Sequence, residues 1–73
     1  MTAFVIEYNR RTGSSVVHQF DSPNGSEAAM NKRFELEDSR TDSDVEIVSL
    51  VSSSIDAIRH THSRYFAHHV ELV

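Results

Sequence analysis

The pattern that decides the fold lies in residues 4–20, which read FVIEYNRRTGSSVVHQF. Apolar or aromatic side chains alternate with polar ones on either side of a polar middle, and this period of two is typical of half-buried β-strands. Gly13 can adopt the positive φ angle that closes a three-residue hairpin loop, which would consist of residues 11–13. The stretch therefore predicts an antiparallel β-hairpin over residues 3–20.

The length of this loop sets the expected register of the hairpin. With three residues in the loop, Phe4 lies opposite Phe20, and Tyr8 shares their face. A shift by one residue would place Phe4 opposite Gln19 and would scatter the aromatic side chains. We expect the first register, which also places His18 on the inner, core-facing side of the hairpin.

A first helix is predicted over about residues 26–39, where Ala, Met, Leu, Lys, Arg and Glu favour helix. Two N-caps are suitable: Ser22, with Pro23 at the first helical position, or Ser26, which avoids placing Gly25 inside the helix. Taken alone, residues 33–37 would also suit a strand. On a helical wheel one broad arc collects Ala29, Met30, Arg33, Phe34, Leu36 and Glu37.

Two further elements and a tail follow. Residues 45–51 form a nearly continuous apolar run, which predicts a third strand. Apolar and aromatic residues spaced i, i+3, i+4 and i+7 predict a second helix over residues 54–67. The tail, residues 68–73, alternates again and is compatible with either a short edge strand or a frayed end.

The element order β-β-α-β-α predicts an α+β fold, a two-layer sandwich in a single domain of residues 1–73. A helical crossover makes the second and third strands parallel, so the third strand can lie antiparallel beside the first. We expect a three-stranded, mainly antiparallel sheet of order 2-1-3 with both helices on one face. The other face would be half apolar, with Val5, Glu7, Val17 and Gln19 on its hairpin strands.

Composition narrows the class of protein. The chain has 73 residues and no cysteine, so neither disulfides nor thiolate zinc sites can stabilise its small core. A net charge of −4 argues against broad nucleic-acid binding, which depends on basic residues. No signal peptide or membrane-spanning run is evident, so we expect a cytoplasmic protein with no membrane association. Such a small chain gains stability from a partner, and a homodimer is a serious hypothesis.

The histidines are the first candidates for chemistry. His60 and His62 lie on opposite sides of the second helix, and His62 and His69 are about 10 Å apart along it, too far for one metal ion. We therefore expect no metal site, no cofactor and no catalytic residue. The candidates for a polar or pH-sensitive core are His18, His62 and Tyr65, with His18 and His62 close together under the second helix.

The arginines are the candidates for an interaction site. Arg10 and Arg11 lie at the hairpin tip, and Arg59 and Arg64 lie on the second helix. Arginine-tipped hairpins can enter nucleic-acid grooves, but these four residues come from two separate elements and do not form a continuous basic stripe. Solvated side chains whose stems cover apolar edges are the simpler interpretation.

The segment Ile55–Phe66, together with the loop Arg11-Thr12-Gly13, resembles small bacterial proteins of unassigned function, and this resemblance implies no activity. Our leading hypothesis is a non-enzymatic protein-interaction module, self-associating through its half-apolar sheet face or an open strand edge. The first alternative is a nucleic-acid-associated regulatory protein that uses the four arginines. The second alternative is a small metal-binding protein or a histidine-dependent enzyme.

Overall fold

The computed structural model describes residues 2–21 and 24–73 of the chain. Strands β1 (Thr2–Asn9) and β2 (Ser15–Phe20) form the hairpin and are followed by helix α1 (Gly25–Ser39). Strand β3 (Val45–Ser52) comes next, then helix α2 (Ile55–Thr61), the 3-10 helix η1 (Ser63–Phe66) and the short strand β4 (Val70–Leu72). The predicted α+β class is confirmed.

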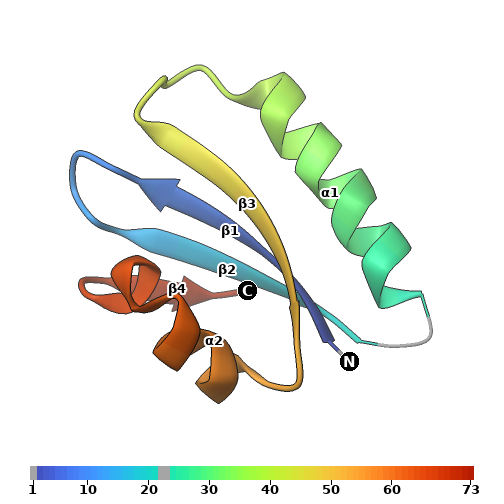
Figure 1. Ribbon diagram of the computed structural model, residues 1–73. Coiled ribbons are helices and arrows are strands. Elements are labelled where there is room, and N and C mark those ends of the chain that lie inside the picture. The colour runs from blue at the N-terminus through green and yellow to red at the C-terminus, as the bar shows by residue number, and fades with distance from the viewer. Residues whose placement is uncertain (1, 22–23) are drawn as a thin grey trace.

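The four strands form one mixed sheet in the order β3-β1-β2-β4. Strand β1 is antiparallel to both β2 and β3, as predicted, whereas β4 pairs with β2 in parallel. The sheet thus has four strands rather than three, because the alternating tail is a strand. Figure 1 shows β1 and β2 as the inner strands, with β3 and β4 at the two edges.

The predicted hairpin register is wrong by one residue. Phe4 lies opposite Gln19 rather than Phe20. The cause is a four-residue loop, since the amide of Asn9 donates to the carbonyl of Ser14 (2.9 Å). The side-chain oxygen of Asn9 also accepts from the amides of loop residues 11 and 12, at 2.9 and 3.2 Å. Gly13 does take the expected positive φ, 79°.

The two helices cover opposite faces of the sheet, so the fold has three layers and the prediction of both helices on one face is wrong. On one face Val5 packs with Ala29 of α1. On the other face Phe4 and Ile6 pack with Ile58 of α2. Because consecutive residues of β1 point to opposite faces, the unbroken apolar run of residues 3–6 is buried from both sides. Figure 1 shows the long α1 apart from the short α2, with the sheet between them.

The ends of the helices differ from their predicted bounds. Helix α1 begins at Gly25 after an N-cap at Asn24 without a side-chain cap bond, so Ser26 is not the N-cap. The alternative start at Ser22 and Pro23 lies outside the described residues. The predicted second helix over residues 54–67 is instead two short helices.

Helix α2 is short because its chain turns at His62, which has φ −129° and ψ 49°. Ser54 is the N-cap of α2, and its hydroxyl accepts a hydrogen bond from the amide of Ala57 (3.1 Å), as is usual for serine N-caps. After the turn, η1 places Tyr65 in the core. Among the described residues, no helix combines the length and the hydropathy needed to cross a membrane.

Candidate interaction surface

Strand β3 has an open outer side, because among the described residues only β1 pairs with it. The amide of Arg10 donates to the carbonyl of Asp44 (2.9 Å), so even-numbered residues of β3 bond to β1. The outward-facing backbone groups therefore belong to the odd-numbered residues. The guanidinium group of Arg40 confirms this orientation, because it donates to the carbonyl of Val45 (3.0 Å) from outside the sheet. The remaining outward-facing residues are Ile47, Ser49 and Val51.

Helix α1 exposes two apolar side chains, and one of them, Met30, lies beside this edge. Met30 is 57% exposed and Phe34 is 56% exposed, one turn apart on α1, and Val51 of β3 is 59% exposed. We call Met30, Ile47, Ser49 and Val51 together the β3 edge surface. Ala29 and Leu36, in contrast, are the α1 residues that pack on the sheet. The broad arc seen on the helical wheel is therefore divided between core and surface.

Arg33 connects the helix to the strand within this surface. Its guanidinium group lies 3.4 Å from the hydroxyl of Ser49 and 3.0 Å from the carboxylate of Glu37, one helical turn away. These contacts place this side of α1 over the outer half of the sheet. The positive charge of Arg33 is balanced within its own helix.

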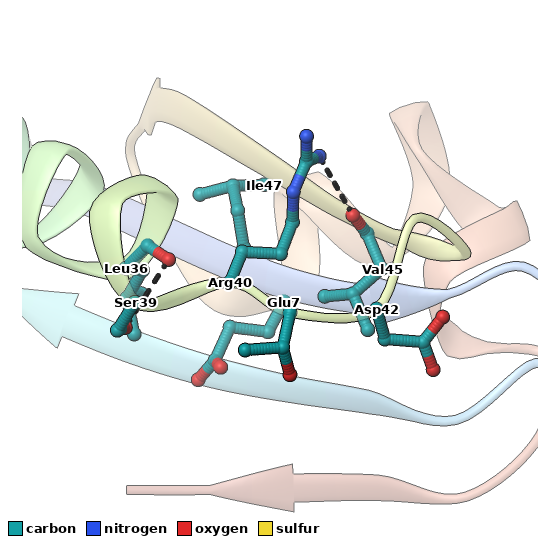
Figure 2. Close-up of a pocket in the computed structure, with 8 residues that line it drawn as sticks. Glu7, Leu36, Ser39, Arg40, Asp42, Val45 and Ile47 are labelled. Carbon is teal, nitrogen blue, oxygen red and sulfur yellow. Dashed lines mark hydrogen bonds between the residues drawn. The ribbon is translucent and has the colours of Figure 1, made fainter.

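Two small clefts follow the seam between α1 and β3. The larger, about 160 Å³, adjoins the loop before β3, and Figure 2 shows Arg40 reaching from it toward Val45, away from the Glu7 carboxylate. The smaller, about 140 Å³, lies beside Met30 and Val51. Both are below the range of about 300–1,000 Å³ that small-molecule sites usually occupy. The residues that line the larger cleft are Glu7, Leu36, Ser39, Arg40, Thr41, Asp42, Val45 and Ile47.

The arginines at the hairpin tip contact the loop before β3. Arg10 donates to the carbonyl of Ser43 (2.8 Å), and Arg11 lies 3.8 Å from the carboxylate of Asp42 and 3.7 Å from that of Asp44. The carboxylates of Asp42 and Asp44 offset the positive charge of Arg11, which would otherwise be available to bind a phosphate group. These contacts join the β1–β2 loop to the α1–β3 loop.

The arginines of α2 and η1 lie over aromatic rings. Arg59 sits 5.5 Å from the ring centre of Phe66. Arg64 lies 5.2 Å from the ring centre of Tyr65 and 3.6 Å from the carboxylate of Glu46. Burial raises the pKa of Tyr65 above its ordinary value of 10.0, and the nearby Glu46 carboxylate raises it further.

The expected proximity of His18 and His62 is wrong, because the two rings lie on opposite sides of the sheet. His18 is on the α1 face, where its Nε2 is 2.7 Å from the Glu7 carboxylate. His62 is on the α2 face, with its ring stacked on Tyr65 at 6.4 Å between centres. The one-residue change in hairpin register moved His18 to the other face.

The C-terminal histidines have structural contacts of their own. The ring of His68 packs against Gly13, and the carbonyl of His69 accepts from the amide of Ser15 (2.9 Å). Within residues 2–21 and 24–73, no three histidine, aspartate or glutamate side chains are arranged to hold a metal ion.

The sequence interpretation did not single out the β3 edge surface. The one sequence signal for it was the apolar run of residues 45–51, which predicts a strand but does not indicate which edge of the sheet stays open.

Comparison with known proteins found no matching family model, no matching curated protein and no matching solved structure.

Proposed function

We propose that this chain is a non-enzymatic protein-interaction module that binds another polypeptide along the β3 edge surface. One observation carries the proposal: outward-facing backbone groups at Ile47, Ser49 and Val51 lie beside exposed Met30, which lines a cleft with Ser49 and Val51. Backbone groups at an open strand edge can extend the sheet with a strand from another chain, and adjacent apolar side chains add affinity.

The support comes from a different surface than the sequence suggested. The half-apolar sheet face that motivated the hypothesis is not formed: Val5 is 0% exposed under α1, and Val17 is buried on the other face, with Ile58 of α2. The opposite sheet edge is less suitable for binding, because β4 has only three residues. Strand β3 is eight residues long, and within residues 2–21 and 24–73 its outer edge is blocked only at one end, by Arg40. Open edges of this length are usually shortened, charged or covered in proteins that have no partner.

The test is a pair of lysine substitutions at matched apolar positions on the two sheet edges. Val51 and Leu72 are 59% and 58% exposed, so neither Val51→Lys nor Leu72→Lys should disturb the core. Tagged protein from each variant is isolated from the host, and the bound polypeptides and nucleic acids are identified. A polypeptide, including an untagged copy of the chain, should remain bound to wild type and Leu72→Lys but be lost from Val51→Lys. Nucleic acid as the main bound species, unaffected by Val51→Lys, would contradict the proposal.

A further inference from the structure

We infer that the partner at the β3 edge surface is a second copy of this chain, paired antiparallel about a two-fold axis that passes through Ser49. The inference rests on the proposed function and names the partner. It follows from the backbone orientation, the order of side chains along β3 and the distribution of charge around them. Each of these features of one chain matches the same feature of an antiparallel second copy.

The available backbone groups are centred on Ser49. Ile47, Ser49 and Val51 point their amide and carbonyl groups outward, whereas the Val45 carbonyl already accepts from Arg40. An antiparallel copy with Ser49 opposite Ser49 uses these three residues and no others. About six inter-chain hydrogen bonds result, two for each outward-facing pair. Val45, whose carbonyl is bound by Arg40, stays outside the pairing.

The side chains along β3 are self-complementary in this register. With Ser49 opposite itself, Ile47 lies opposite Val51 and Val48 lies opposite Leu50, so apolar side chains meet on both faces of the sheet. A two-fold axis one residue earlier, at Val48, would place Glu46 opposite Leu50. The sequence Ile-Val-Ser-Leu-Val is close to palindromic in apolar character, which is the property that a symmetric strand pair requires.

The same symmetry brings the two α1 helices together. Opposite residues of an antiparallel pair share a face, so both copies carry α1 on the same side of an extended eight-stranded sheet. Arg33 contacts Ser49, which places the side of each helix that carries Arg33 next to the axis. Met30 of the two copies then lies on the sides of the helices that face each other.

Charge does not oppose this approach. The chain carries a net charge of −4, yet the residues that define the β3 edge surface are uncharged. Arg33 beside it is balanced by Glu37 at 3.0 Å. Glu46, at the start of the strand, lies 3.6 Å from Arg64 on the other face. Two identical copies can therefore meet here without bringing unbalanced like charges into contact.

The size of the contact indicates a reversible dimer. A five-residue edge is about 17 Å long, and the sheet and helix layers together are about 20 Å deep. Both copies together then bury on the order of 700 Å², below the roughly 1,200–2,000 Å² of stable specific interfaces. We therefore expect a dissociation constant in the micromolar range rather than a permanent dimer.

The experiment uses serine-to-cysteine substitutions in the full chain, which has no native cysteine. Ser49→Cys places two thiols at the axis, where the Cα atoms of a hydrogen-bonded pair are about 5.5 Å apart, within the range that a disulfide spans. Ser53→Cys, exposed on the same segment, is the matched control, because its two copies would be separated by about eight residues of strand. Wild type, Val51→Lys and Leu72→Lys are compared by sedimentation equilibrium.

The expected result is a disulfide-linked dimer for Ser49→Cys but not for Ser53→Cys under mild oxidation. Sedimentation should show a dimer for wild type and Leu72→Lys. For Val51→Lys the dissociation constant of the dimer should rise at least tenfold, which shifts the chain toward monomer. A wild-type chain that stays monomeric at high micromolar concentration would overturn the inference. If such a monomer still retains a different polypeptide in a Val51-dependent manner, the proposed function stands and only the identity of the partner is wrong. Linkage through Ser53→Cys alone would overturn the register.

Discussion

The side-chain hydroxyl of Ser15 donates a hydrogen bond to the backbone carbonyl of Tyr65, and both residues are buried. The bond joins the first residue of β2 to η1, which lies fifty positions farther along the chain. A second link is made by the amide of Ser15, which donates to the carbonyl of His69. One residue thus holds the C-terminal segment against the hairpin through both its side chain and its backbone.

We predict that Ser15→Ala destabilises the fold by about 1–3 kcal/mol, because the buried Tyr65 carbonyl loses its hydrogen-bond donor and water cannot replace it. The free energy of unfolding is measured by urea denaturation followed by circular dichroism. Ser53→Ala, at an exposed position, is the control and should change stability by less than about 0.5 kcal/mol. Equal stabilities for the two variants would contradict a structural role for the Ser15 hydroxyl.

Local sequence signals predicted the elements well, because they depend on properties that each segment carries itself. The alternation in β1 and β2 and the positive φ of Gly13 are of this kind. The register was predicted incorrectly because it depends on a side chain: Asn9 accepts from two loop amides and so stabilises a loop one residue longer. A difference of one residue then reversed the face of every β2 side chain.

The three-layer arrangement could have been predicted from the apolar run in β1. Phe4, Val5 and Ile6 are consecutive apolar residues, a pattern typical of a strand buried on both faces. The candidate arginines were placed correctly on the hairpin tip and on the segment from α2 to η1, but their acidic and aromatic neighbours come from distant parts of the chain. The exposure of Met30 and Phe34 depends on how α1 is rotated on the sheet, which the loose amphipathic pattern left undetermined.

A second prediction concerns the hairpin loop. Gly13→Ala should destabilise the protein by about 2 kcal/mol or more, since alanine is strained at positive φ and its Cβ would overlap the His68 ring. In a His68→Ala background the overlap is removed, and the penalty should fall to the conformational cost of about 1–2 kcal/mol. A double-mutant cycle measures the difference. An unchanged penalty in that background would show that the ring does not pack on Gly13.

A third prediction follows from the raised pKa of Tyr65. The folded state favours the neutral phenol, so this contribution to stability is complete below the unfolded value, about pH 10, and is lost as pH rises through the higher folded pKa. Unfolding free energies of wild type and Tyr65→Phe are compared from about pH 8 to about pH 11.5. As pH rises, wild type should lose more unfolding free energy than Tyr65→Phe, because phenylalanine cannot ionise. A difference that stays constant over this range would contradict a raised pKa.

The last prediction tests whether α1 covers the face that the sequence left open. Val5→Thr changes shape very little but places a hydroxyl where the side chain is 0% exposed, so we expect a loss of about 1–3 kcal/mol. Val51→Thr makes the same chemical change on the same face at a position that is 59% exposed, and it should alter stability by less than about 0.5 kcal/mol. Urea denaturation of both variants gives the comparison, carried out at low protein concentration so that self-association does not contribute. If Val5→Thr is tolerated as well as Val51→Thr, Val5 faces solvent, and the two-layer arrangement is correct instead of the three-layer one.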